Sequence, residues 1–314
     1  MAYRASDTRV SIVVPHLGND AEFEDSLVSV LENQPADTEV WVAHDGHYQD
    51  PFDLGDEVRF ITNRGHTLPE LIGCAAEVVT GRFVHVIAGG VRATVGWIDA
   101  ALEKFEHEDT AIVAPVARQT AAGPITAAGW TSTTSRLAEP LAEGKNELGR
   151  RDAALIRGVC LAASFWRRDE LRSATRALAT DSLSAAQFGW SRLLCRRGWR
   201  CLLAEESVVL ADASMLGLAP SMNRGATLRS LESKIEGISL AGSAVSVGIA
   251  AFSNLLRPSI WGEVTGEAIS LVHRSSVGCS LHLDEIQSPE DAIATIRIPQ
   301  FLPAAPANIT RRAA

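Results

Sequence analysis

The sequence predicts an α/β fold, in which helices flank a mostly parallel sheet and a helical appendage follows at the C-terminal end. Two observations support this prediction. Short β-branched runs alternate with helical patterns through the first two thirds of the chain, which is typical of parallel strands joined by crossover helices. From about residue 213 the apolar residues recur at helical spacing instead. We therefore expect a sheet domain over 8–212, a mostly helical appendage over 213–300 and a disordered Pro/Ala-rich tail over 301–314.

Strands are expected where the chain has short, apolar, β-branched runs. In the first part of the chain these runs cover residues 10–15, 39–43, 58–62, 83–87 and 111–116. Apolar residues at helical spacing predict helices between them, one of which covers 68–79. Ligands of parallel sheets bind beyond the carboxyl ends of the strands, so we expect the residues that follow these strands to share one crevice.

The second part of the sheet domain is less regular. Residues 117–150 are small and polar, which predicts a long loop or weak strands. The elements expected after them are a strand over 158–165, an Arg-rich helix over 167–178, a helix over 188–197 and strands over 201–204 and 208–211. One short strand, 292–298, is expected within the appendage.

The net charge of −9 over 314 residues argues against a nucleic-acid binder, because phosphate backbones require clustered positive charge. The charge is unevenly distributed. Residues 1–60 contain thirteen Asp or Glu and three Arg, whereas residues 150–200 contain eleven Arg and four Asp or Glu. The Arg-rich region could face an anionic ligand such as a diphosphate, or it could be a solvated helix face. Both interpretations are open at this point.

The five cysteines are scattered and form no CxxC pair, which fits buried thiols in a reducing compartment. The first nine residues are polar and lack the apolar core of a signal peptide, so we expect a cytoplasmic protein. Residues 237–256 carry no charge and are long enough to cross a membrane. Their glycine and serine content favours a packed helix or hairpin, and membrane association through 237–256 is the alternative.

Five stretches resemble a known enzyme family in the order in which they occur. They are 10–15 (Val-Ser-Ile-Val-Val-Pro), 39–50 (Glu-Val-Trp-Val-Ala-His-Asp-Gly-His-Tyr-Gln-Asp), 80–84 (Thr-Gly-Arg-Phe-Val), 96–98 (Gly-Trp-Ile) and 194–203 (Leu-Cys-Arg-Arg-Gly-Trp-Arg-Cys-Leu-Leu). Over residues 8–212 the chain is similar to family 2 glycosyltransferases. The resemblance implies the GT-A fold of nucleotide-diphospho-sugar transferases, a nucleotide sugar (UDP-linked) as partner, and sugar transfer to an unknown acceptor.

Asp45 is the site residue that agrees best with the family pattern. In the family the equivalent carboxylate accepts a hydrogen bond from the nucleotide base, usually from uracil N3–H. The resemblance thus places Pro15, Asp45 and Gly46 in a nucleotide-binding site. Turn chemistry alone also explains an Asp-Gly pair after a strand, with Asp45 capping its own turn. The sequence does not separate these two roles.

The metal-binding carboxylates of the family correspond here to Ala88, Gly89 and Gly90. A divalent metal is the cofactor expected for the family, because it neutralises the diphosphate and binds through hard oxygen ligands. Alanine and glycine side chains supply no such ligand. We therefore predict no metal site at this turn and name no certain cofactor.

Two other catalytic positions also depart from the family. Its helix arginine corresponds to Ile72, and its acidic pair with the general base corresponds to Ala186 and Gln187, which cannot take up a proton. Asp181 lies a few residues upstream. Asp181 is the remaining candidate for the catalytic base, provided that the loop is re-routed.

Two alternatives could replace the missing metal ligands. Arg157, Arg192, Arg167 or Arg168 could stabilise a diphosphate directly. We name Arg157 and Arg192 as the diphosphate-binding candidates.

A different metal site could be formed by His16, His44, His47 and His85, since imidazoles at neighbouring strand ends suit zinc or another transition metal. Against this alternative, His85 lies in the middle of an apolar strand, where a hydrogen-bonded core histidine is the usual case.

The sequence leads to two functional hypotheses. The first is a glycosyltransferase-like protein with weak or lost transferase activity. The second is a non-catalytic relative, a pseudoenzyme that binds a nucleotide, a glycan or a partner transferase. The missing carboxylates favour little or no metal-dependent transfer.

Overall fold

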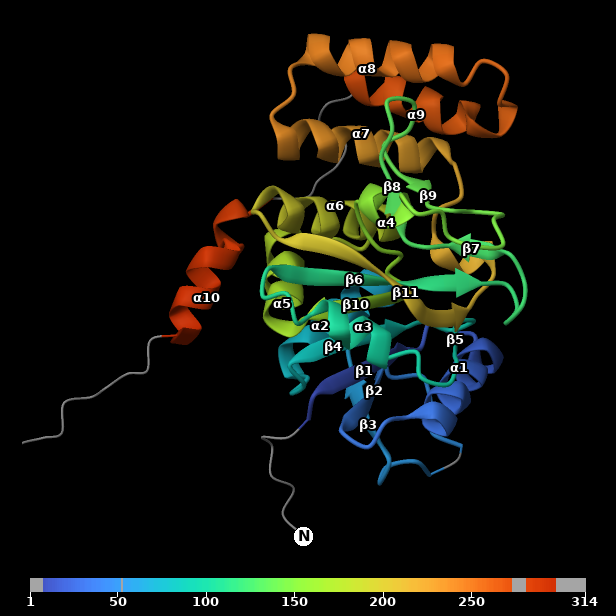
Figure 1. Cartoon of the computed structure of the whole chain (residues 1–314), viewed down its shortest axis with the longest axis vertical. Helices are drawn as coiled ribbons and strands as arrows, with labels where there is room; N and C mark the ends of the chain where they lie inside the picture. Colours follow the sequence, from blue (N-terminus) through green and yellow to red (C-terminus); the bar gives the residue numbers. More distant parts are fainter. Residues whose placement is uncertain (1–7, 52, 273–280, 298–314) are drawn as a thin grey trace, which may run out of the picture.

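The computed structural model describes residues 8–51, 53–272 and 281–297 (Figure 1). Within these residues a nine-stranded sheet forms the centre of the molecule. Its strands are β1 (Val10–Pro15), β2 (Thr38–His44), β3 (Val58–Thr62), β4 (Phe83–Ile87), β5 (Arg92–Ala93), β6 (Thr110–Arg118), β7 (Ile125–Ala127), β10 (Ala163–Arg167) and β11 (Arg200–Leu210). They are ordered β3-β2-β1-β4-β10-β6-β11-β5, and β7 pairs with β6.

The sheet is mostly parallel, as predicted. Strands β1 to β4 are parallel to one another, and β11 is parallel to β6. Strand β10 is inserted between β4 and β6 and is antiparallel to both. The strand order reverses at β1, since β2 and β3 lie on one side of it and β4 on the other. Such a reversal is where α/β sheets bind ligands, beyond the carboxyl ends of the strands.

Helices cover both faces of the sheet. They include α1 (Asp20–Asn33), α2 (Leu68–Val78), α3 (Asp99–Lys104), α4 (Asp152–Leu155), α5 (Arg168–Ala177) and α6 (Leu183–Arg196). Helix α1 packs on β1 and β5, and α2 packs on β1 and β2. The crossover from β1 to β2 contains α1, the crossover from β3 to β4 contains α2, and the two run in opposite directions along the sheet. Because such crossovers are right-handed, α1 and α2 lie on opposite faces. Strands β1 and β4 are buried along their whole length, which explains their continuous apolar sequences.

The irregular part of the chain differs in detail from the prediction. Residues 117–150 contain β7 and a small hairpin of β8 (Trp130–Thr131) and β9 (Glu139–Pro140), which correspond to the weak strands expected there. The two strands expected at 201–204 and 208–211 form the single strand β11. An irregularity in its pairing with β6, between Leu203 and Val208, explains why the sequence pattern is interrupted there.

The prediction of a strand over 292–298 was wrong, because helix α10 (Pro289–Arg297) occupies this region. Ser288 precedes the helix, and its Oγ accepts a hydrogen bond of 3.3 Å from the backbone N–H of Asp291. Pro289 starts the helix, and acidic residues follow in its first turn. These are helix-start signals, and they determine the local structure more strongly than the β-branched residues nearby.

Beyond β11 the described elements are helical. They are η1 (Ala213–Leu216), α7 (Met222–Glu236), α8 (Leu240–Ser253), η2 (Pro258–Ile260), α9 (Trp261–Val272), η3 (Leu283–Glu285) and α10. Helix α7 packs on α6, α9 packs on α7, and α8 packs on α9, as the upper part of Figure 1 shows. The domain boundary at 212/213 remains a prediction, and the tail over 301–314 lies outside the described residues. In the part of the chain that the structure describes, each helix is too short or too weakly apolar to cross a bilayer.

Two buried ion pairs connect α7 to α9. Arg224 lies 2.6 Å from Glu263, and Arg229 lies 2.6 Å from Glu267. Burial lowers the pKa of Arg224 and raises the pKa of Glu267, since desolvation disfavours the charged form of each group. Removing one partner of such a pair typically costs about 3–5 kcal/mol, because the other charge is left buried and unpaired. The pairs therefore strongly favour a single packing arrangement of the two helices.

Two glycines allow the backbones of α7 and α9 to come close enough for these pairs to form. A Cβ atom at Gly225 would lie 1.9 Å from the carbonyl oxygen of Glu263, and one at Gly266 would lie 1.9 Å from that of Met222. Both distances are far shorter than any van der Waals contact. Any side chain at either position would therefore separate the helices.

We expect Gly225→Ala and Gly266→Ala each to destabilise the protein by at least about 1–3 kcal/mol, because the added methyl groups force the helices apart. Gly248→Ala in α8 is the matched control. A Cβ at Gly248 meets no atom within 4 Å, so alanine should leave stability unchanged or raise it by about 0.5–1 kcal/mol. Thermal and urea denaturation measure all three variants. Equal effects at the three positions would contradict the close packing of α7 and α9.

Candidate functional site

The turn after β4 lies at the point where the strand order reverses, and it is held closely by the first turns of α1. The N–H of Gly90 donates to the carbonyl of Glu22 at 3.1 Å, and the hydroxyl of Ser26 donates to the carbonyl of Ala88 at 3.3 Å. A Cβ at Gly89 would lie 3.4 Å from the backbone nitrogen of Phe23. The backbone of α1 thus lies in contact with the turn, whose two glycines stay partly exposed.

Met215 of η1 covers the same turn from the other side. Gly90 has a φ of +82°, in the left-handed region that favours glycine, and a Cβ there would lie 3.0 Å from Met215 Sδ. The groups in contact with the turn thus include backbone atoms, the Ser26 hydroxyl and a thioether. No group of three or more His, Cys, Asp or Glu side chains suited to a metal ion occurs among the described residues. This set of donors does not fit a hard divalent cation, which requires several oxygen ligands.

Asp45 follows β2 and is bound within its own loop. One carboxylate oxygen accepts the N–H of His47 at 2.9 Å, which is the turn-capping role considered from the sequence. The other oxygen lies 3.1 Å from Nδ1 of His66 and 3.1 Å from Nδ1 of His47. The backbone N–H of His47, followed by these imidazoles, holds the pKa of Asp45 well below its usual range. Asp45 is thus ionised and preoriented, with 22% of its side chain exposed.

Aromatic rings fill the space between the ends of β1 and β2. The ring of Tyr48 lies 4.9 Å from those of both His16 and Phe23, and His16 and Phe23 are 5.0 Å apart. Burial raises the pKa of Tyr48 to about 12, so its hydroxyl stays protonated. Neither the Tyr48 hydroxyl nor Nδ1 of His16 has a hydrogen-bond partner among the described residues. The strand ends next to Pro15 are therefore closed by the protein's own side chains.

The position that the sequence resemblance assigns to the catalytic base has a structural role. Gln187 on α6 is buried, and its Oε1 accepts the N–H of Leu161 at 3.1 Å. Asp181 lies upstream in the exposed connection between α5 and α6 and lines a cavity of about 690 Å³ together with Asn63 and Glu70. The turn after β4 is not part of that cavity's lining. A catalytic role for Asp181 stays a prediction.

The arginine candidates already have protein partners. Arg192 lies 3.3 Å from Glu232 and 2.9 Å from Glu236, so it links α6 to α7. Arg157 is exposed and donates to the backbone carbonyls of Ala154 and Ile156. The role of Arg157 and Arg192 in diphosphate binding stays a prediction.

Arg167 and Arg168 lie at the amino end of β4, away from its Ala88 end. Arg167 is paired in register with Phe83, the first residue of β4. The two guanidinium groups donate to the carbonyls of Thr110 and Thr80. These contacts hold loops at the opposite edge of the sheet from the expected diphosphate.

The alternative of a histidine metal site is wrong, because the described residues contain no such group of ligands. His85 is fully buried and stacks on Phe165, with ring centroids 3.6 Å apart and planes 5° apart. Its Nδ1 donates to the carbonyl of Ser164 at 3.0 Å. Burial lowers the pKa of His85 to about 3, so the ring is neutral in the folded protein.

Sequence reasoning did not identify Met215 and Tyr48, which close the turn and the strand ends. Met215 lies in an ordinary apolar stretch far along the chain from Gly90, and no local pattern indicates their contact. Tyr48 had a weak signal, since it is an aromatic residue in the polar loop that follows Asp45.

His85 and Glu170 should give opposite pH dependences of stability. The folded pKa of His85, about 3, lies below its ordinary 6.5. The contribution of the neutral ring to the free energy of unfolding is therefore lost as the pH falls below 6.5. Burial raises the pKa of Glu170 from 4.5 to about 7, so its contribution is lost as the pH rises towards 7. We expect His85→Phe to be about 2 kcal/mol more stable, relative to wild type, at pH 5 than at pH 7.5. Urea denaturation at both pH values measures this difference. A constant difference would contradict a neutral, buried His85.

No protein-family model matches the sequence, and no curated protein matches it. Solved structures do. Mannosyltransferase PcManGT from Pyrobaculum calidifontis, in complex with GDP-Man and Mn²⁺, has a TM-score of 0.50 and 15% identity, covering 91% of this chain and 79% of that one. GalNAc-T7 with UDP, GalNAc and Mn²⁺ has a TM-score of 0.51 and 13% identity, covering 74% of this chain and 48% of that one. This chain thus spans about half the length of GalNAc-T7. At these identities the similarity shows the fold alone, and the chain has a GT-A-like α/β fold, as the sequence resemblance implied.

Proposed function

We propose that this chain is a degenerate relative of family 2 glycosyltransferases that binds a nucleotide sugar and transfers the sugar weakly or not at all. Its partner would be a UDP-linked sugar, and any transfer would proceed without a divalent metal at the end of β4. The proposal is supported by the fold and by the two similar structures, each of which contains Mn²⁺ with a nucleotide or a nucleotide sugar.

The observation that carries this proposal is the composition of the turn after β4. In this chain Ala88, Gly89 and Gly90 stand where the family has its carboxylates, and α1 and Met215 lie in contact with the turn. A side chain at Gly90 would need a positive φ and a shift of Met215, whereas a Cβ at Gly89 would make an ordinary contact with α1.

The nucleotide-binding part rests on Asp45. Its low pKa and its hydrogen bonds provide an ionised acceptor at the end of β2, beside Gly46 and near Pro15 of the neighbouring strand. A carboxylate in this position suits the N3–H donor of uracil. Neighbouring Tyr48 would have to move for a base to stack against β1, since its ring now fills that space.

A non-catalytic protein that binds a nucleotide, a glycan or a partner transferase is the second candidate. It is favoured by Gln187, which replaces the family's base and is used to hold Leu161 in the core. A donor-hydrolysis assay with UDP-sugars separates the two candidates. Turnover that Asp181→Asn abolishes would support the enzyme, and its absence would support the non-catalytic protein.

We also propose a cytoplasmic location. Four cysteines in the described residues, Cys74, Cys160, Cys195 and Cys201, are free thiols, and free thiols fit a reducing compartment.

Nucleotide binding should not depend on manganese. We expect the Kd for UDP, measured by titration calorimetry, to change by less than about twofold when Mn²⁺ replaces EDTA, because the described residues place no group of metal-binding side chains at the turn. Thermal shifts with Mn²⁺ alone should be absent. UDP binding that Mn²⁺ tightens about tenfold or more would contradict this account of the turn.

Base selectivity should depend on Asp45. We expect UDP to bind at least about tenfold more tightly than CDP, because N3 of uracil donates a hydrogen bond whereas N3 of cytosine accepts one. Asp45→Asn should reduce this preference, since an amide offers both a donor and an acceptor. The variant keeps an oxygen that can accept the N–H of His47, so the turn remains capped. Competition titrations with both nucleotides give the ratio of the Kd values for CDP and UDP. If Asp45→Asn leaves this ratio unchanged, Asp45 does not contact the base.

A further inference from the structure

The outer face of α8 is strongly apolar. Of the fifteen large apolar side chains that are exposed in the described residues, nine lie within 240–272. Residues 237–272, all of them described, contain three charged side chains, and Glu263 and Glu267 are buried, which leaves Arg257 as the exposed charge of this segment. Monomeric proteins rarely expose apolar patches larger than a few hundred Å², so this face marks an interaction surface.

The exposed residues of α8 form a regular seam along the helix. Four of them follow one another at spacings of four, three and four residues, namely Ala241, Val245, Gly248 and Phe252. This is the spacing at which one helix packs along another. The seam points away from the face by which α8 packs on the rest of the protein, which is formed by Ser243, Val247 and Ala250.

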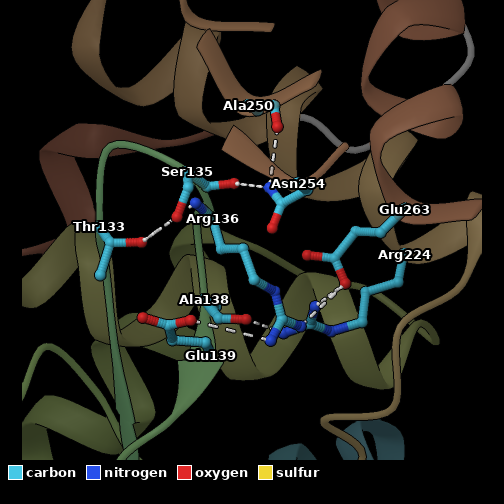
Figure 2. A network of polar contacts seen from close by, with 9 residues as sticks. All are labelled: Thr133, Ser135, Arg136, Ala138, Glu139, Arg224, Ala250, Asn254 and Glu263. Atoms are coloured by element: carbon cyan, nitrogen blue, oxygen red, sulfur yellow. Dashed lines mark hydrogen bonds and ion pairs between the residues drawn. The ribbon is translucent and has the colours of Figure 1, made fainter. Parts of the chain in front are cut away.

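Polar contacts hold α8 in place from its buried side. The amide of Asn254, at the C-terminal end of α8, donates to the carbonyls of Ser135 at 3.0 Å and Ala250 at 2.8 Å, as Figure 2 shows. Near the N-terminal end the hydroxyls of Ser233 and Ser243 lie 3.0 Å apart. The seam is therefore presented in a fixed orientation, which lowers the entropic cost of docking a partner there.

The area of this face is close to what a stable dimer requires. Its large apolar side chains are 45–95% exposed, and they are Leu240, Val245, Ile249, Phe252, Leu255 and Leu256. With about 150–200 Å² for one fully exposed side chain of this size, the six together expose on the order of 600 Å². A standard interface buries about 800 Å² on each partner, and the small residues between these side chains supply part of the remainder.

The seam is complementary to itself when two copies of α8 run antiparallel. With a two-fold axis midway between Val245 and Gly248, each large side chain of one copy lies opposite a small residue of the other. The resulting pairs are Phe252 with Ala241, Ile249 with Ala244, and Val245 with Gly248. Large residues that face small ones can interdigitate without voids, and the two-fold axis forms every pair twice.

Other occupants fit this face less well. A parallel pair would place Phe252 against Phe252 and Ala241 against Ala241, which crowds one end and leaves a gap at the other. It would also bring the two Arg257 side chains to the same end of the pair. A lipid surface has no counterpart to the alternation of sizes, and an anionic bilayer would repel a chain with a net charge of −9.

We propose that the outer face of α8 is the contact of a symmetric dimer, in which α8 of a second copy packs antiparallel against it. Figure 1 shows α8 as the outermost helix of the appendage, far from β1, β2 and β3. The contact therefore leaves the crevice at the strand ends accessible in both copies. The proposal holds whether or not the chain binds a nucleotide.

Sedimentation velocity on the full chain tests the proposal. We expect a particle of twice the 33.6 kDa chain mass at a concentration of about 10 μM. A monomer at every concentration up to about 100 μM would overturn the proposal. Flotation with phosphatidylcholine–phosphatidylglycerol vesicles is measured in parallel, and a monomer that floats with the vesicles would assign the face to lipid and also overturn the dimer.

Val245→Glu tests the location. Val245 is 64% exposed, so a carboxylate can replace it without entering the core of one copy. In the dimer two carboxylates would be buried near the axis without partners, and we expect the dimer Kd to rise by about a hundredfold or more. Ser253→Glu is the matched control, because Ser253 is exposed on α8 outside the seam, and it should change the Kd by less than about threefold. Equal effects of the two variants would contradict the proposed contact.

Cysteine cross-linking of Ala241→Cys and Phe252→Cys tests the orientation. In the antiparallel pair position 241 of one copy faces position 252 of the other, whereas identical positions lie about 16 Å apart along the helix axes. A disulfide requires Cα atoms within about 7 Å. We therefore expect mild oxidation to cross-link a mixture of the two variants, and neither variant alone beyond the level of the wild type. Cross-linking of each variant alone would show a parallel pair and overturn the proposed arrangement.

Discussion

The close packing around the turn after β4 is the constraint on which the interpretation of this protein depends. At the point where the strand order reverses, the backbone of α1 contacts Gly89, and Met215 contacts Gly90. The positive φ of Gly90 and its contact with Met215 favour glycine there, and both glycines of the turn stay partly exposed. The side chains of Ala88, Gly89 and Gly90 supply no carboxylate of the kind that a divalent cation needs.

Buried ion pairs also fix the packing of the helical appendage. Glu263 is shared by Arg224 of α7 and by Arg136 of the segment between β8 and β9, so one carboxylate joins the appendage to the sheet domain. Such groups are costly to bury and tolerate little rearrangement once paired.

The arginines of region 150–200 show that a cluster of positive charge in the sequence does not by itself mark a ligand site. The Arg-rich region 150–200 suggested an anionic ligand, but in the structure many of these side chains bind carbonyls and carboxylates of neighbouring elements. Arg172 and Arg176 on α5 bind the end of α2, Arg176 through a bidentate contact with Glu77 at 2.7 and 2.8 Å. Asp45, in contrast, was identified from its position after a strand. It is held as an ionised acceptor by contacts within its own loop and with His66.

The sequence by itself determined the main strands of the sheet and its mostly parallel character, because burial on both faces produces apolar runs that local patterns reveal. It also located the ends of β2 and β4, where Asp45 and Ala88 lie. Only the tertiary structure decided what surrounds those ends, since Met215 contacts Gly90, and Tyr48 contacts His16 and Phe23, across long distances in sequence. Side-chain packing over such distances leaves no periodic signal, so these contacts could not be predicted from the sequence.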